Sequence, residues 1–434
     1  MTSPGSAAED SAGYGEVFRE NRNFRLLWLG TSISLFGDWF NTITLYTLVT
    51  KLTGSPLAVG LVEFLKLGGF AAASIPAGIL ADRFDRRKLM VIADALRAVL
   101  VLGFLFVDSQ EELPLLYGLI VIQVALGAVF EPANRALMPT LVSQRELLTA
   151  NAALAATWST ILAVGAAVGG LVTSAIGSDA VFVIDSLTYV ASAACILAIR
   201  MPSHALPVAS APAMPGRRVR PTVLFITAYA DLREGFRYLR THRLVARLAL
   251  AKTAWALGGS ALVYFLTQLG PQLTPLDPAL GIGILYSARG AGTGIGPILA
   301  RRYLSRRMWL PATGLMIAIS GVLYFTVGLL PATFVIAIPI VVAHTASGAN
   351  WVLSTVLLQE LVPNHVRGRV FAAELMVLMG VEAVVVLGAA ALLETHILSL
   401  ALAILAFAVL QALTGLAYTR WLGSSESPQP SDHV

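Results

Sequence analysis

Long apolar runs separated by short polar breaks make up most of the chain. Each run is close to the roughly 20 residues that an α-helix needs to cross the hydrocarbon core of a membrane. Strands of a membrane barrel would instead alternate apolar and polar residues, which these runs do not do. The pattern predicts twelve transmembrane helices, at about residues 26–50, 56–81, 89–107, 113–134, 151–176, 178–200, 244–270, 280–300, 309–330, 334–362, 371–393 and 397–421.

The composition agrees with a membrane protein. Hydrophobic residues make up 56% and charged residues 13% of the 434 residues, and the mean hydropathy is +0.75. Soluble domains carry about 25% charged residues, so a soluble enzyme is excluded. The single cysteine, Cys195, lies in an apolar run, which excludes a disulfide framework and a cysteine-based metal site. Residues 1–17 lack the apolar core of a signal peptide, so we expect the first apolar run to be retained as a helix.

The basic residues predict the orientation. If the N-terminus is cytoplasmic, 25 of the 30 Lys and Arg residues fall in cytoplasmic segments, and only Lys51 lies in an outer loop. Such an excess of positive charge marks the cytoplasmic side of a membrane protein. We therefore expect a multi-pass protein of the inner (plasma) membrane with both termini in the cytoplasm.

The chain also repeats itself at about half its length. The segment ILADRFDRR at 79–87 is similar to ILARRYLSRR at 298–307, at an offset of 219 residues. Parallel repeats of this kind build many secondary transporters, although short basic loops can also look alike by chance. The repeat predicts two six-helix bundles, at 18–200 and 244–421. A Pro-rich linker with an amphipathic cytoplasmic helix would fill 201–243, and disordered cytoplasmic tails would cover 1–17 and 422–434.

The loop between the second and third runs carries the first family resemblance. Its sequence, GILADRFDRRK at 78–88, resembles the loop signature of the major facilitator superfamily, with Asp85 where Gly is usual. Gly permits close helix approach, Asp can cap a helix, and clustered Arg suits anionic headgroups. The resemblance implies an all-α membrane protein with twelve transmembrane helices in two pseudo-symmetric six-helix bundles. It also implies that this loop is a conformational latch, made of Gly78, Asp82, Arg83, Arg86 and Arg87. The alternative is that the loop is only a positively charged anchor on the cytoplasmic side.

Further motifs narrow the resemblance. The segments 18–39, 52–62, 132–142 and 368–372 together resemble the drug:proton antiporter subgroup, which includes macrolide efflux proteins and the enterobactin exporter. In the fifth run, Gly165, Gly169 and Gly170 match most of an antiporter motif, although such small residues also serve ordinary helix packing. The family's R-x-x-Q-G signature fails in the fourth run, where Gln123 and Leu126 replace its Arg and Gln, so a proton relay on that Arg is not expected.

Charged residues inside the predicted helices each need a reason, because insertion scales assign each a cost of about 2.5–3.5 kcal/mol. A carboxyl group at this depth can carry a proton, or it can make a structural hydrogen bond. Arg289 could pair with such a carboxylate, and His344 could titrate near neutral pH or simply be hydrogen-bonded. The residues expected to couple transport to protons are therefore Asp38, Glu382, Arg289 and His344.

The resemblance implies that helices 1, 4, 7 and 10 line a central cavity and that helices 2, 5, 8 and 11 join the two halves. On this scheme Asp94 and Arg97 of the outer third helix neutralise each other, and Asp185 is structural. Glu63 and Lys66 share a helix face and are expected to pair. The residues expected to line the substrate cavity are Trp39, Glu63, Lys66, Glu131, Trp158, Lys252, Tyr264, Asn350 and Trp351. The alternative for these residues is a role in helix packing or simple solvation.

Signatures of ATP-driven and hydrolytic proteins are absent from the sequence, which has no phosphate loop, H-E-x-x-H or G-x-S-x-G. The alternating glycines at 290–296 lie in an apolar run, which favours helix packing or a hinge over a nucleotide loop. We expect a non-enzymatic exporter of small hydrophobic or amphipathic compounds, driven by proton antiport with alternating access. Its expected partners are a small-molecule substrate, protons and membrane lipid, without cofactor, metal or nucleic acid, and the chain is expected to act as a monomer. A siderophore or lysophospholipid transporter is the alternative within transport, and a non-transporting scaffold or sensor is the alternative outside it.

Overall fold

A computed structural model describes residues 12–201 and 221–423, and every element within these ranges is helical. The side chains of Ile75, Asp82 and 221–229 also lie outside the description. Among the described residues, nine helices are long and apolar enough to cross a membrane. The predicted all-α membrane fold is confirmed. Expectations for residues 1–11, 202–220 and 424–434 fall outside the described part of the chain.

The N-terminal half is built from elements that follow one another with short turns. They are α2 (Tyr14–Glu20), α3 (Arg22–Thr53), α4 (Pro56–Arg83), α5 (Arg86–Val101), η1 (Leu102–Phe106), η2 (Gln110–Glu112), α6 (Leu113–Leu141) and α7 (Gln144–Leu197). The 54-residue α7 contains both the fifth and the sixth predicted helix. Between them Gly177 has φ of 84°, a left-handed conformation that favours glycine, and the chain turns there.

The C-terminal half follows the same plan after a helix that crosses between the halves. Its elements are α8 (Pro221–Thr241), α9 (Arg243–Ala249), α10 (Ala251–Leu273), α11 (Pro278–Tyr303), η3 (Arg306–Met308), α12 (Trp309–Leu329), η4 (Phe334–Ile336), α13 (Ala337–Leu361), α14 (Asn364–Glu394) and α15 (Leu400–Gly423). The seventh predicted helix is interrupted at Leu250, so α9 and α10 replace one continuous run. With α7 counted as two segments, the helices are compatible with the predicted twelve spans.

Polar residues at the breaks start the helices where the apolar runs begin. The side chain of Ser55 accepts a hydrogen bond from the backbone N–H of Ala58 and caps α4, and Pro56 occupies the first turn. Asp277 caps α11 in the same way, followed by Pro278. Asp85, which stands where the family has glycine, accepts from the N–H of Lys88 at 2.9 Å and caps α5. That departure from the family pattern is therefore used as a helix cap.

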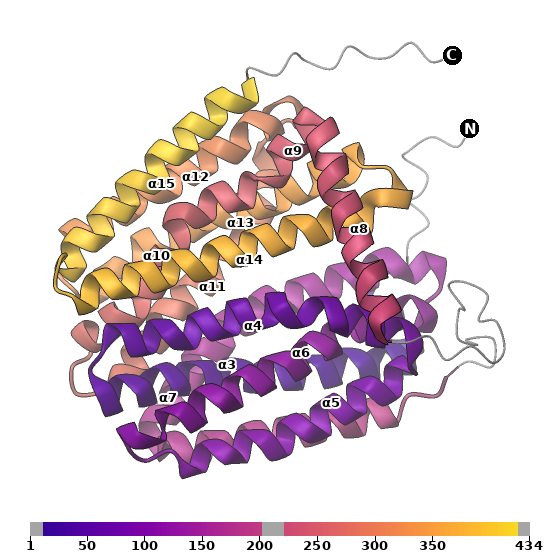
Figure 1. Cartoon of the computed structure of the whole chain (residues 1–434), viewed down its shortest axis with the longest axis horizontal. Helices are drawn as coiled ribbons and strands as arrows, with labels where there is room; N and C mark the ends of the chain where they lie inside the picture. The colour runs from indigo at the N-terminus through magenta and orange to yellow at the C-terminus, as the bar shows by residue number, and fades with distance from the viewer. Residues whose placement is uncertain (1–11, 202–220, 424–434) are drawn as a thin grey trace.

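Two pairs of helices join the halves. α7 packs along α11, and α4 packs along α14. Figure 1 shows α4 and α14 side by side at the centre of the molecule, with α8 crossing them near one end. These are the second, fifth, eighth and eleventh predicted helices, so the expected interface is the one observed.

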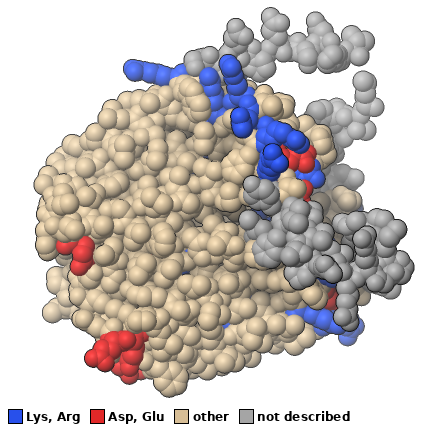
Figure 2. Space-filling model, in the orientation of Figure 1, with Lys and Arg blue, Asp and Glu red and all other residues tan. Residues whose placement is uncertain are grey.

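Charge divides the molecule into two ends. The basic end carries the arginines of the turn after α4, and Figure 2 shows Lys and Arg gathered towards one side of the molecule. The acidic end carries Asp108, Glu111 and Glu112 in the turn before α6. Between them Figure 2 shows a band of uncharged surface, as a membrane-spanning region requires.

The start of the chain corrects one expectation. A disordered tail was expected over 1–17, but α2 begins at Tyr14, and Ala12 is buried. The backbone N–H of Ala12 donates to the carbonyl of Arg145 at 3.0 Å, and the hydroxyl of Thr149 donates to the carbonyl of Ala12 at 2.6 Å. The segment is ordered because α7 supplies partners for its backbone.

Candidate transport site

The two halves meet tightly at the acidic end. The hydroxyl of Ser55 donates to the Glu394 carboxylate at 2.6 Å, and the hydroxyl of Tyr264 donates to the carbonyl of Pro56 at 2.6 Å. Ser174 of α7 also donates to Asp277 at the start of α11. Tyr264 is almost fully buried, so it closes this end and does not line an open cavity as expected.

Deeper in the molecule, aromatic rings extend this closure. Tyr286 of α11 lies against Trp39 and Tyr46 of α3, with ring centroids 6.2 and 5.9 Å apart. The segment of α3 from Phe40 to Thr47 is buried throughout. Nearer the basic end, Trp158 and Trp351 are 44% and 43% exposed. The centre is therefore sealed towards the acidic end, and these two side chains nearer the basic end are exposed.

Charged side chains from both halves gather at this depth. Lys66 of α4 interacts electrostatically with Glu63 and Asp38 of its own half and with Arg289 of the other half. Glu382 of α14 interacts with Glu63 and Arg289 across the interface. We call Asp38, Glu63, Lys66, Arg289 and Glu382 the central charged group. The group mixes three carboxyl groups with two cations.

Asp38 makes a hydrogen bond, one of the two alternatives that the sequence left open, and its side chain is partly exposed. Its side chain is 38% exposed, and its Oδ1 accepts a hydrogen bond from the hydroxyl of Tyr189 on α7 at 2.5 Å. Its Oδ2 lies 3.9 Å from a guanidinium nitrogen of Arg97 on α5. The carboxyl group of Asp38 is therefore held by α7 and lies near a cation of α5, while part of its surface stays exposed.

Glu63 and Lys66 do not form the direct ion pair that was expected. Glu63 accepts a hydrogen bond from the hydroxyl of Tyr46, and the ammonium of Lys66 donates to the hydroxyl of Thr42 at 2.6 Å. The correction has a simple reason: α3 runs beside α4 and offers each charged side chain its own hydroxyl partner. Each of the two residues is therefore bonded to a different residue of α3.

Arg289 and Glu382 form no hydrogen bond or ion pair with their side chains to any described residue. The guanidinium of Arg289 lies 5.7 Å from the centre of the Tyr286 ring. His344, expected beside them, is buried, and its Nε2 lies 2.8 Å from the hydroxyl of Tyr324. His344 therefore makes the hydrogen bond that the sequence left as one alternative.

The remaining cavity candidates fall into two groups. Lys252 is buried and pairs with Glu374 of α14 at 2.9 Å, beneath the Trp351 ring, so it belongs to the packing of the C-terminal half and not to an open cavity. Asn350 is buried as well. Glu131 pairs with Arg135 at 2.8 Å near the basic end, with both side chains solvated.

The expected latch residues make their contacts inside the N-terminal half. Arg86 donates to the carbonyl of Ala136 at the end of α6, and Arg87 donates to the carbonyls of Ile196 and Leu197 at the end of α7. Cations at helix C-termini are favourable because free carbonyls point there. Arg83 is exposed, and the side chain of Asp82 lies outside the described residues.

Glycines of the two motifs differ in their surroundings. A Cβ at Gly78 would meet open space, so the close approach expected there is not made in this conformation. A Cβ at Gly165 or Gly169 would lie 3.1 Å from Trp39 Cβ or 3.0 Å from Phe40 Cα. Gly170 faces Gly283 of α11 across the interface between the halves. The fifth-helix glycines therefore lie at close helix contacts.

Several partners were missed by the sequence. Tyr189 and Arg97 flank Asp38, Tyr46 binds Glu63, and Glu374 holds Lys252. An acidic residue within the predicted eleventh helix was a signal for Glu374. The tyrosines gave no signal, because their sequence positions do not reveal which helix they face. Within the described residues, no cluster of three or more His, Cys, Asp or Glu side chains could hold a metal ion.

Two repeated helical halves around a charged centre at membrane depth define a multi-pass membrane protein of the secondary-transporter class. Residues 27–384 match the Major Facilitator Superfamily. The chain belongs to this family, and it is a carrier and not an enzyme.

Similar proteins include efflux proteins. The putative bacilysin exporter BacE of Bacillus subtilis is 26% identical, over 81% of this chain and 84% of that protein. Macrolide efflux protein A of Streptococcus pyogenes is 25% identical, over 80% of this chain and 84% of that protein. The POT family transporter PepTSo has the same fold, with a TM-score of 0.71 at 14% identity, over 94% of this chain and 99% of that one.

Proposed function

We propose that this protein exports small amphipathic compounds in exchange for protons. The observation that carries the proposal is Asp38, a half-exposed carboxyl group at the depth where the two halves meet. A carboxylate at membrane depth is costly and is retained where it carries charge or protons. Proton entry at Asp38 and compound binding among its neighbours would then compete for the same space.

The central charged group supports an amphipathic substrate. Trp39, which is only partly buried, offers a flat apolar surface, and the side chains of Arg289 and Glu382 make no hydrogen bond or ion pair with any described residue. Ligand sites of this kind combine apolar walls with a few polar groups that fix orientation. The relatives' names, which refer to bacilysin and macrolide efflux, agree with small-molecule export.

The difference between the two ends supports alternating access. In this conformation the two halves are bonded together at the acidic end, whereas Trp158 and Trp351 nearer the basic end are exposed. We place the basic end and both termini in the cytoplasm, in the inner membrane, because basic residues gather on that side. The opposite state would close the basic end, where Gly78 has room for a second helix and the latch residues lie.

Transport assays in inside-out vesicles with an acidic interior test the proposal. Erythromycin or ethidium added outside should release protons from the interior, which a pH-sensitive dye reports. Asp38→Asn should abolish this release while the protein still elutes as a single species in detergent. Asp179→Asn, an exposed carboxyl group at the acidic end, is the matched control and should behave as the wild type. Undiminished release by Asp38→Asn would remove Asp38 from the mechanism.

One feature favours a lipid as a second candidate substrate. An apolar cavity of about 390 Å³ lies between α4 and α14, lined by Phe64, Gly68, Ala71, Met376 and Gly380 among others. Such a cavity in the seam between the halves suits an acyl chain that enters sideways. Transfer of a spin-labelled lysophospholipid between leaflets of proteoliposomes, without any response to erythromycin or ethidium, would favour this candidate.

A further inference from the structure

Asp38 lies against a buried wall made by the outer helix α5 and by α7. Tyr189 of α7 is fully buried and donates its hydroxyl hydrogen to Oδ1 at 2.5 Å. Arg97 of α5, with a side chain only 5% exposed, places Nη1 3.9 Å from Oδ2. One oxygen of the carboxyl group is thus hydrogen-bonded, and the other faces a guanidinium that is just beyond hydrogen-bonding distance.

The guanidinium of Arg97 is held in place from three sides. It pairs with Asp94, one helical turn earlier on α5. Its Cζ lies 4.5 Å from the centre of the Tyr189 ring and 4.8 Å from the centre of the Phe130 ring. Its Nε–H has no hydrogen-bond partner among the described residues. The side chain is therefore fixed in direction but keeps an unused donor.

The charges around Asp38 do not balance locally. Its titratable neighbours are Lys66 from α4, Asp94 and Arg97 from α5, and Asp185 and Tyr189 from α7. α6 contributes Phe130 and Gln123, which donates to the Tyr189 hydroxyl at 3.1 Å, and α11 contributes Tyr286 beside Trp39. The buried guanidinium thus faces three carboxyl groups, those of Asp38, Asp94 and Asp185. The Arg97 guanidinium can pair with Asp94 alone, or it can pair with both Asp94 and Asp38 when the Asp38 carboxyl group is ionised.

We propose that Arg97 is a positioning residue for proton coupling, which sets the proton affinity of Asp38 by dividing its charge between Asp38 and Asp94. The inference rests on the proposed function, because it presumes that Asp38 carries the proton. When Oδ2 gives its proton to water, the carboxylate draws the guanidinium towards it. When Oδ2 takes up a proton, Arg97 returns to Asp94 and Asp38 is held by Tyr189 alone. The bond broken and remade is the Oδ2–H bond, and no other proton is transferred.

An infrared pH titration tests this without any substrate. The carboxyl band of protonated Asp38 in proteoliposomes is assigned by its loss in Asp38→Asn, and its midpoint is followed with pH. Arg97→Gln should move that midpoint up by about one pH unit, since a carboxyl group near a lost cation releases its proton less readily. Asp94→Asn should move it down, because Arg97 is then free for Asp38. Arg97→Lys, which keeps the charge, should stay nearest the wild type.

Arg97→Gln and Asp94→Asn should shift the Asp38 midpoint in opposite directions. A loss of structure in both variants would instead shift the midpoint in the same direction, so the two explanations can be distinguished. Arg240→Gln, an exposed arginine on α8, is the matched control and should leave the midpoint unchanged. An Asp38 midpoint that is unchanged in both Arg97→Gln and Asp94→Asn would overturn the inference. If Arg97→Gln does not give monodisperse protein, Asp94→Asn decides alone, and an unmoved midpoint there overturns it.

The same variants separate this inference from the proposed function. If erythromycin and ethidium release no protons from wild-type vesicles, export of those compounds fails, yet the infrared midpoints still report on Arg97. If wild type exchanges protons and Asp38→Asn does not, but the midpoints ignore Arg97 and Asp94, only the role of Arg97 fails.

Discussion

The ion pair between Lys252 and Glu374 shows what single charges do inside the C-terminal half. Both side chains are buried, and the Lys252 ammonium lies 4.7 Å from the centre of the Trp351 ring. The pair joins α10 to α14, so it ties a helix expected to line the cavity to a helix of the interface. Burial of two charges is tolerated only because each neutralises the other.

We expect Lys252→Met to lower the free energy of unfolding by about 3–5 kcal/mol, because Glu374 would be left buried and unpaired. The double variant Lys252→Met/Glu374→Leu removes both charges and should recover most of that loss. Thermal unfolding in detergent, followed by tryptophan fluorescence, measures the difference. A double variant as unstable as Lys252→Met would show that the pair is not the source of the effect.

At this scale the sequence predicted which residues matter better than it predicted their partners. Asp38 and Glu382 stand out because a carboxyl group in an apolar run is rare. Their partners come from residues far along the chain, such as Tyr189 for Asp38. A helical sequence gives spacing around its own axis but not the rotation of each helix in the bundle. Lys252 and Tyr264 were placed in a cavity for that reason, and the structure buries both.

The helix α11 shows how glycine spacing serves two neighbours at once. A Cβ at Gly290 would meet the backbone of Ala163 on α7, and one at Gly294 would lie 3.3 Å from Ser159 Cβ. Gly292 and Gly296 instead face the backbone of α13, next to His344 and Ala349. Pairs four residues apart share one helix face. One face therefore touches the other half of the molecule and another touches its own half, as the packing interpretation of these glycines expects.

Substitutions on these faces should have different consequences. Gly292→Ala should destabilise the protein by about 1–3 kcal/mol, because α13 would be forced away within the same half. Gly290→Ala acts on the interface between the halves and should disfavour the conformation seen here. Gly388→Ala, where a Cβ meets open space, is the matched control. Melting temperatures in detergent measure the difference in stability. A Gly292→Ala variant that melts at the same temperature as the control would contradict the expected destabilisation.

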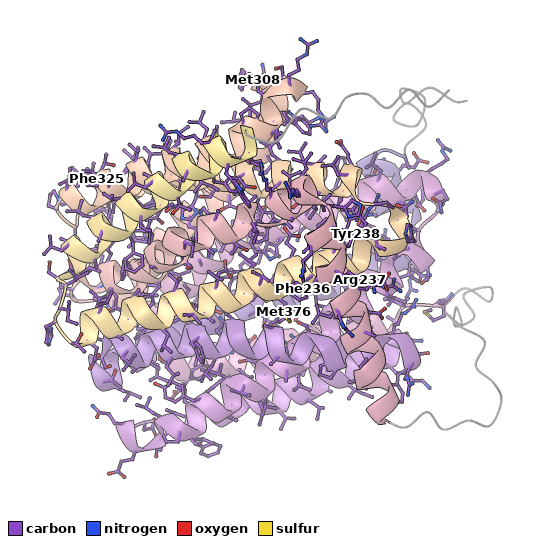
Figure 3. The ribbon with its side chains drawn as sticks, turned by 45° about the horizontal axis from the view of Figure 1, so that its top comes forward. Phe236, Arg237, Tyr238, Met308, Phe325 and Met376 are labelled. Carbon is purple, nitrogen blue, oxygen red and sulfur yellow. The ribbon has the colours of Figure 1, made fainter. Side chains whose placement is uncertain are left out.

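The helix α8 is a strap across the basic end. Arg369 of α14 pairs with Asp231 at 2.9 Å and with Glu234 at 2.7 Å, and Gly235 approaches the backbone of Arg369 closely. α8 also contacts α4 of the other half. Figure 3 shows α8 crossing α14, with Phe236, Arg237 and Tyr238 labelled on it and Met376 on α14. An amphipathic helix was expected here, but its docking on α14 was not.

We expect Arg369→Gln to loosen this strap. Exposed ion pairs contribute up to about 1 kcal/mol each, and two are lost together. Hydrogen exchange of residues 230–241 should therefore become several-fold faster, while the core of α10 stays unchanged. Arg301→Gln, an exposed arginine at the same end, serves as control. Equal exchange in the two variants would mean that apolar contacts alone hold α8.

For the whole molecule, the internal repeat predicted the two halves, and the family resemblance implied which helices join them. The repeat extends to contacts: Arg86 binds the end of α6, and Arg306, at the matching place in the second half, pairs with Glu360 near the end of α13. The conformational state could not be predicted, because it depends on small differences between contacts at the two ends. Ser55, Tyr264 and Glu394 close the acidic end here.

Labelling from either side of the membrane tests the orientation and the state together. In a Cys195→Ala background, Trp351→Cys should react with a membrane-impermeant maleimide in inside-out vesicles and not in right-side-out vesicles. Leu45→Cys, at a buried position on α3, should stay unlabelled from both sides. Labelling of Trp351→Cys only from the opposite side would reverse the proposed orientation.

The turn at Gly177 has a consequence for how the protein is made. α7 passes from the fifth to the sixth predicted helix through one left-handed residue, without a loop. Because no loop residues separate the two segments, we expect them to enter the bilayer together as a helical hairpin during synthesis. A bulky residue at position 177 should lower the efficiency of membrane insertion more than it lowers the stability of the assembled carrier. Such a variant should therefore be produced in low yield, while the protein that is purified should be as stable as the wild type.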